Sequence, residues 1–177
     1  MYKQKRELIE QRTEELLRSS GTCRVPVPIE RVAQYLNLIT TATALGDDIS
    51  GLLLVENKKA VIGYNSMHAP VRQRFTLAHE IGHFVLHVKG SSQSRLFIDK
   101  YVVYRRDQQS SKGDDQEEVE ANAFAAALLM PARLVRSEIK RHDLDLDDED
   151  DLCVLANRFD VSTSAMSNRL VNLELLR

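Results

Sequence analysis

The sequence predicts an α+β fold with a small antiparallel sheet, a helix that carries two closely spaced histidines, and several further helices. Three segments rich in Leu, Ile, Val and Thr, at 38–44, 50–55 and 60–65, are separated by turn-forming residues and predict the strands. Apolar residues recur at helical spacing on both sides of this region. The length of 177 residues and the hydrophobic content of 43% fit one ordinary domain with a small appendage.

Two helices are expected before the sheet. The first covers residues 3–19, with Gly21 where a helix C-terminal glycine commonly stands, and the second begins at Pro28, which suits a first helical turn. Apolar residues mark one side of each helix: Leu8, Ile9, Leu16 and Leu17 in the first, and Ile29, Val32, Ala33 and Leu36 in the second.

The N-terminal residues are charged throughout and contain no apolar run long enough for a signal peptide or a membrane span, so we expect a cytoplasmic protein with no membrane partner. Cys23 and Cys153 are too few for a disulfide framework, and we expect both to be reduced thiols that bind no metal. A net charge of −2 and a pI near 6.2 argue against a chain devoted to nucleic acid.

Residues 79–83 read HEIGH and lie in a segment with the apolar spacing of a core helix, opened by Pro70. His79 and His83 are four positions apart, so one turn of helix places both imidazoles on the same face. Two such side chains can bind one Zn²⁺ with Zn–N bonds of about 2.0–2.1 Å. Glu80 adjoins the first histidine, where a carboxylate can take a proton from an attacking water. The pattern predicts a metal-dependent peptidase, and a buried helix with structural histidines is the alternative.

Beyond the motif, the sequence predicts a strand at 96–104, an exposed loop at 107–116, a helix at 117–130 and a short helix at 131–141. An acidic run, 143–151, then suits the N-terminus of a further helix. We expect two parts, a peptidase domain at 1–142, and an acidic linker with terminal helices at 143–177.

A peptidase site with two histidine ligands needs a third protein ligand and leaves one position open for water. Glu118 and Glu120 are the candidates on the helix at 117–130. We choose Glu118, because Asn122 one turn later can hold its carboxylate or a neighbouring ligand in place. Glu120 stays open as the alternative. Two histidines and one carboxylate suit Zn²⁺, and also Mn²⁺ or Fe²⁺.

Other polar side chains near the motif have less specific roles. His87 continues the histidine series but lies about 12 Å from His79 along a helix axis, too far to share one ion. We expect it to support the site without binding the metal. Four side chains are chemically able to donate a hydrogen bond to the oxyanion of the reaction, and the sequence assigns none of them: His68, Tyr101, Tyr104 and Arg105.

The chain resembles the ImmA/IrrE metallo-endopeptidases, bacterial and phage zincins that cleave helix-turn-helix repressors. The resemblance rests on VPVPIERVAQYLNL, ISGLLLV, AVIGYN, RFTLAHEIGHFVLH, EVEANAFAAALLMP and LANRFDVSTSAMSNRLVNLEL. It implies a zincin-like peptidase fold, with His79, His83 and Glu118 as metal ligands and Glu80 as the catalytic base. It further implies an XRE-type transcriptional repressor as protein substrate, whose hydrolysis relieves repression in a phage, mobile-element or stress-response circuit. Larger members carry a sensory domain after the terminal helices, and we expect any signal to reach this chain by another route.

Residues 152–173 have the pattern of a helix-turn-helix, with a turn at Val161 and Ser162. Such a unit can bind DNA, but between Asp150 and Arg177 three arginines stand against three aspartates and one glutamate. A major-groove reader ordinarily carries lysine or arginine for phosphate contacts. We therefore expect these helices to pack on the peptidase domain or to dock the substrate, without direct DNA binding. The alternatives are a DNA-binding regulator and a protein that sequesters a repressor uncut, each with a non-catalytic metal site.

Overall fold

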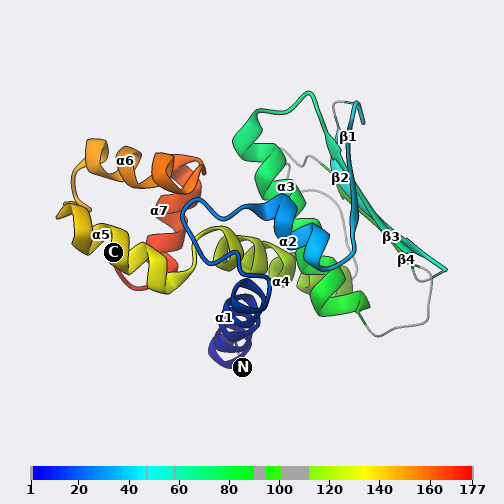
Figure 1. Ribbon diagram of the computed structural model, residues 1–177, viewed down its shortest axis with the longest axis horizontal. Helices are drawn as coiled ribbons and strands as arrows, with labels where there is room; N and C mark the ends of the chain where they lie inside the picture. Colours follow the sequence, from blue (N-terminus) through cyan, green and yellow to red (C-terminus); the bar gives the residue numbers. More distant parts are fainter. Residues whose placement is uncertain (1, 47, 58, 90–94, 101–111, 177) are drawn as a thin grey trace.

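The computed structural model describes residues 2–46, 48–57, 59–89, 95–100 and 112–176. The fold is α+β, with the helices α2 and α3 on one side of a four-stranded sheet (Figure 1). In chain order the elements are α1 (Tyr2–Ser19), α2 (Ile29–Tyr35), β1 (Ile39–Thr43), β2 (Ile49–Glu56), β3 (Lys59–Asn65), α3 (Pro70–His83) with its continuation η1 (Phe84–Val88), β4 (Arg95–Lys100), α4 (Lys112–Leu129), α5 (Ala132–His142), α6 (Glu149–Phe159) and α7 (Thr163–Asn172). In the described parts of the chain, no helix is both long enough and apolar enough to cross a membrane.

The sheet is mixed, which corrects the expectation of a purely antiparallel sheet. Its strand order is β1-β3-β2-β4, and β2 pairs antiparallel with both β3 and β4. β1 pairs with β3 in parallel, with Ile39 opposite Val61. The physical reason is the hairpin: a short turn makes β3 run back beside β2, and β3 then separates β2 from β1. The chain between the parallel strands β1 and β3, which includes β2, is therefore the connection that crosses from one to the other.

The face of the sheet that meets α3 carries the core. Leu53, Val55, Ala60 and Ile62 alternate along β2 and β3 and are at most 8% exposed. They belong to the same apolar cluster as Leu77, Ala78 and Ile81 of α3. α3 is therefore held between the sheet and α4, and its motif residues lie inside the molecule.

α3 and α4 approach each other closely at Gly82. A Cβ atom built on Gly82 would stand 3.1 Å from the carbonyl oxygen and 3.2 Å from the Cα atom of Ala121 in α4. The small residues on both sides of the crossing let the two backbones approach closely. This contact sets the α4 side chains near Ala121 beside the histidines of α3.

Several element boundaries differ from the sequence-based expectation. α4 begins at Lys112, so residues 112–116, predicted as exposed loop, form its first turn. The acidic residues of this segment favour a helix N-terminus. The segment has no apolar residues at helical spacing, so its sequence does not predict a helix. β4 ends at Lys100, and the rest of the strand predicted at 96–104 lies outside the described residues, as do residues 107–111 of the predicted loop.

The C-terminal helices form the pattern that the sequence predicts. The Asp148 side chain accepts hydrogen bonds from the backbone N–H groups of Asp150 and Asp151 and caps α6, and the Ser162 hydroxyl accepts one from Ala165 N–H and caps α7. α5, α6 and α7 gather at one end of the molecule, away from the sheet (Figure 1). The division at residue 142 is still a prediction.

Candidate metal centre

The two motif histidines lie side by side on the buried face of α3. His79 Nε2 and His83 Nε2 are 3.0 Å apart, and the side chains are 2% and 1% exposed. Apolar neighbours on α3 bury this face against the sheet and α4, so the imidazoles are fixed by the core of the domain. Helical spacing at i and i+4 gives this arrangement directly.

α4 brings Glu118 to the same point. Its two carboxylate oxygens lie 3.2 Å from His79 Nε2 and 3.0 Å from His83 Nε2. Glu120 faces another way, toward α1, where it accepts hydrogen bonds from Lys5 at 2.7 Å and from Gln116 at 2.9 Å. Of the two candidates, the structure brings only Glu118 to the histidines.

The three converging side chains fit a divalent metal ion. Their ligand atoms all lie within 4.8 Å of one another, and no other such group occurs among the described residues. Tetrahedral bonds of about 2.0–2.1 Å place neighbouring ligand atoms about 3.3 Å apart, close to the separations found here. Two imidazole nitrogens and one carboxylate are also the donor set of catalytic zinc sites that retain an open position.

Asn122 fixes the orientation of His79. Its side-chain oxygen lies 3.1 Å from His79 Nδ1, one helical turn after Glu118 on α4. A hydrogen bond donated by Nδ1–H to this oxygen leaves the lone pair of Nε2 pointing toward Glu118. The supporting role of Asn122 is still a prediction, and the structure gives it His79 as its side-chain partner.

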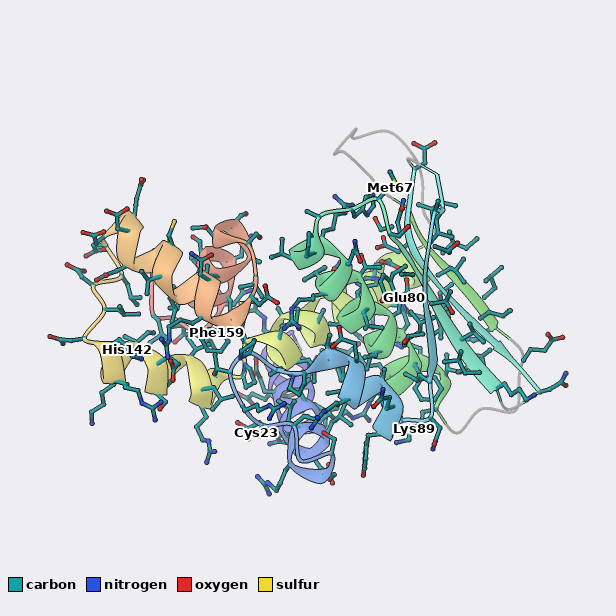
Figure 2. The ribbon with its side chains drawn as sticks, turned by 45° about the horizontal axis from the view of Figure 1, so that its top comes forward. Cys23, Met67, Glu80, Lys89, His142 and Phe159 are labelled. Carbon is teal, nitrogen blue, oxygen red and sulfur yellow. The ribbon has the colours of Figure 1, made fainter. Side chains whose placement is uncertain are left out.

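Glu80 is completely buried where α3 passes the sheet (Figure 2). Neither of its carboxylate oxygens has a hydrogen-bond partner among the described residues. Gly51 of β2 makes room for it, since a Cβ atom there would stand 3.0 Å from Glu80 Oε1 and 2.4 Å from a Thr76 methyl carbon. Burial is the main cause that raises the pKa of Glu80 to about 8, and the charges of Asp99 and Glu118 raise it further, against the lowering effect of His79.

The neighbouring groups have shifted pKa values of their own. Burial alone would raise the pKa of Glu118, but the hydrogen bonds with His79 and His83 outweigh it and hold that pKa well below its usual range. Burial likewise would lower the pKa of His79, yet the hydrogen bond with Glu118 and the surrounding carboxylates leave it raised. The site therefore favours positive charge at the point where the three ligand atoms meet.

His87 stands apart from the three converging residues. It lies in η1, where the i→i+5 hydrogen bond from Lys89 N–H to the Phe84 carbonyl marks a π-turn. Its ring centroid is 5.7 Å from that of His83, and its Nε2 is buried without a partner among the described residues. π-turns are frequent at functional sites, but no feature of the sequence announced this one.

Strand β4 supplies residues that sequence reasoning missed. Phe97 stacks on His83 with ring centroids 4.6 Å apart, and the Arg95 guanidinium lies 5.6 Å from the centre of the Phe97 ring. Nothing in the sequence predicts that β4 lies over α3. A glycine inside a strand can mark a close approach, so Gly51 of β2 was the one available signal.

Of the candidate oxyanion donors, Tyr101, Tyr104 and Arg105 lie outside the described residues. His68 lies just before α3, and its backbone carbonyl accepts a hydrogen bond from the side chain of Gln73 in α3.

The ligand group opens into a cleft. A cavity of about 400 Å³ is lined by His83 and Glu118, by Glu117 and by residues 95–98 of β4. The Glu118 side chain is 44% exposed, whereas the side chains of His79 and His83 are 2% and 1% exposed. A segment of another molecule can therefore reach the metal position along β4.

Comparisons with known proteins agree with this geometry. The chain matches the family of IrrE N-terminal-like domains, peptidase M78, over residues 33–171. It is 29% identical over 117 residues to "Uncharacterized immunity region protein 2" of Bacillus phage phi105, covering 66% of each chain. It is 41% identical over 110 residues to "Radiation response metalloprotease IrrE" of Deinococcus deserti, covering 60% of this chain and 34% of that one. The protein of that name from Deinococcus radiodurans is 37% identical over 81 residues, covering 46% and 22%.

The matched part of each relative is at most about two thirds of its length. The family match itself begins in α2 and ends in α7, so it includes the sheet, the α3–α4 crossing and the converging side chains. By this match the chain belongs to peptidase M78, the metallopeptidase family of IrrE N-terminal-like domains.

Proposed function

We propose that the chain is a zinc-dependent endopeptidase that hydrolyses a peptide bond in a helix-turn-helix repressor of the XRE type. The observation that carries the proposal is the convergence of His79, His83 and Glu118 beside Glu80, a buried carboxyl group with no partner among the described residues. A structural zinc site is usually closed by four Cys or His ligands, whereas two histidines and one carboxylate leave a position open.

His79, His83 and Glu118 would hold the ion, and Asn122 would keep the His79 ring in its binding orientation. When bound, the ion supplies Lewis-acid chemistry: it polarises a carbonyl group and lowers the pKa of water from 15.7 to about 7. The donor set favours Zn²⁺ and also accommodates Mn²⁺ or Fe²⁺.

Glu80 is the proposed proton carrier. One of its carboxylate oxygens takes a proton from the water that attacks the scissile carbonyl, and the same carboxyl group gives it to the departing amide nitrogen. Burial raises the pKa of the Glu80 carboxyl group above that of an ordinary glutamate, and a general base works best when its pKa lies near the working pH. Burial against Gly51 keeps competing water away from this carboxyl group.

The resemblance and the names of the relatives support a repressor as the substrate. One relative is named for a phage immunity region and two for a radiation response, and both names suit a peptidase that acts on a regulator. We propose the cytoplasm as the compartment, since a DNA-bound repressor resides there.

Two alternative functions are a DNA-binding regulator and a repressor-sequestering protein, each with a non-catalytic metal site. DNA binding is disfavoured because Arg169 of α7 is 4% exposed and paired with Glu10, and Arg158 of α6 is paired with Glu138. Neither arginine is available for a phosphate contact. Sequestration without cleavage leaves the raised pKa and the burial of Glu80 without a purpose.

The test is direct proteolysis. The purified chain, supplied with Zn²⁺, is incubated with the helix-turn-helix repressor whose gene lies nearest to its own, and the products are identified by intact-mass spectrometry. We expect two fragments that sum to the repressor plus one water, and no cleavage when a chelator is present. An intact repressor in a stable complex would favour sequestration instead.

A further inference from the structure

The face of the sheet turned away from α3 is apolar. In the register of the strands, Ile39 lies opposite Val61, Val61 opposite Leu54, and Leu54 opposite Leu96. Residues directly opposite one another point to the same face, so this row crosses the whole sheet. In a second row, Leu52 lies opposite Ile98 and leans over Gly63, whose Cβ position would be 3.3 Å from Leu52 Cγ. We call these six side chains the outer apolar face: Ile39, Leu52, Leu54, Val61, Leu96 and Ile98.

The outer apolar face is open to solvent. Ile39, Leu54, Leu96 and Ile98 are 54%, 40%, 58% and 45% exposed. α2 and α3 lie on the opposite side of the sheet (Figure 1). An antiparallel strand with one solvated face normally alternates apolar and polar residues, but β2 reads Gly-Leu-Leu-Leu-Val and is apolar on both faces. Contiguous exposed apolar side chains of this kind mark interaction sites.

The outer apolar face is continuous with the cleft at the metal position. Leu96 and Ile98 belong to this face and also line the cleft together with His83 and Glu118. Ile39 stands at the other edge of the sheet, three strand spacings from β4, or about 14 Å. A molecule that covers the whole face therefore reaches the cleft at β4, whereas a short peptide in the cleft does not reach Ile39.

We propose that the outer apolar face docks the folded protein substrate, so that the substrate presents its scissile segment to the cleft along β4. This inference rests on the proposed function. Between β1 and β4 the strands pair with one another, so the face itself presents side chains, and the complementary surface is an apolar helix or sheet face of a folded protein. At one end of the face Glu56 lies opposite Lys59. Because the two side chains carry opposite charges, this end of the face favours neither a positively nor a negatively charged partner. Apolar contact therefore selects the partner.

The experiment compares a folded substrate with a short one. The variants are Leu54→Gln and Ile39→Gln, which lie on the face but do not line the cleft, and the matched control is Leu8→Gln, a 48% exposed leucine on α1. The probes are the repressor encoded nearest to this gene and a synthetic peptide that spans the bond the wild-type chain cuts. Each sheet variant should raise KM for the repressor about tenfold, the effect of losing one well-packed apolar contact, and leave kcat/KM for the peptide within about twofold. Leu8→Gln should change neither.

Each other outcome overturns the inference in a recognisable way. An unchanged KM for the repressor in both sheet variants removes the docking role. An equal loss on the repressor and the peptide means that the cleft itself was distorted. A wild-type dimer that becomes monomeric in Leu54→Gln, measured by sedimentation, means that a second copy covers the face. If the wild-type chain does not cut the repressor, no peptide probe can be defined, and the proposed function fails first and the inference with it. Ile39→Gln, on the far edge strand, decides the matter if Leu54→Gln does not fold.

Discussion

Buried ionisable side chains have different surroundings in the two halves of the molecule: one lacks a partner among the described residues, and the others are paired. Where α3 passes the sheet, Glu80 is fully buried with neither oxygen hydrogen-bonded to a described residue. In the C-terminal helices, Glu138 and Arg169 are also buried, at 5% and 4% exposed, but each has partners. Glu138 pairs with Arg158, and Arg169 pairs with Glu10 and donates to the Met130 carbonyl at 2.9 Å.

Burial of a carboxyl group without a hydrogen-bond partner costs free energy, and we expect a fold to retain such a group only where another use compensates. Burial raises the pKa of Glu80, whereas the hydrogen bonds of Glu118 with His79 and His83 outweigh burial and hold the pKa of Glu118 low. From this difference we expect Glu80 to serve the proposed chemistry and the ion pairs of the C-terminal helices to serve stability. Substitutions that look alike should therefore lower activity in one half and stability in the other.

The largest effect is expected at Glu118. Glu118→Gln replaces a carboxylate with a neutral amide, a poorer donor to Zn²⁺, and should weaken metal binding by more than about 100-fold, beyond the range found for groups that only support a ligand. Glu120→Gln is the matched control and should keep one metal ion per chain, because Glu120 faces Lys5. Metal analysis of both purified proteins checks this prediction, and the reverse result would move the ligand to Glu120.

A smaller effect of the same kind is expected at Asn122. Asn122→Ala removes the partner of His79 Nδ1 and frees the ring to turn. Loss of such a supporting hydrogen bond typically costs about 10–100-fold in metal affinity or activity. Competition with a chelator measures the affinity, and thermal unfolding of the metal-free protein should be nearly unchanged. A full loss of fold would mean that Asn122 acts mainly in packing.

In the C-terminal helices the effect should fall on stability alone. Arg169→Met leaves Glu10 without its partner and should lower the free energy of unfolding by about 2–3 kcal/mol, less than a fully buried pair because Glu10 is 30% exposed. Arg141→Met, at a 67% exposed arginine 3.5 Å from Glu138, should cost less than about 1 kcal/mol. Denaturant unfolding measures both, and cleavage per folded molecule should stay at the wild-type rate. A loss of cleavage without a loss of stability in Arg169→Met would contradict the claim that this ion pair serves stability alone.

The sequence predicted the local arrangement of the site residues better than the contacts that surround them. The spacing of His79 and His83 is local, so helix geometry alone placed them on one face, and the helix-turn-helix pattern was equally local. The parallel pairing of β1 with β3, the stacking of Phe97 on His83, and the pairing of Arg169 with Glu10 join segments far apart in the chain. Such contacts depend on how the elements pack, which periodicity and motifs do not specify.

The role of Glu80 is the central claim, and one variant tests it most directly. Glu80→Gln keeps the size of the side chain but removes the basic oxygen, so the purified variant should bind metal in the same proportion as the wild type and cut the repressor about 10²–10⁴-fold more slowly. The measurement is the rate of cleavage by metal-loaded protein, with metal content determined on the same sample. Undiminished cleavage by the metal-loaded variant would contradict the account.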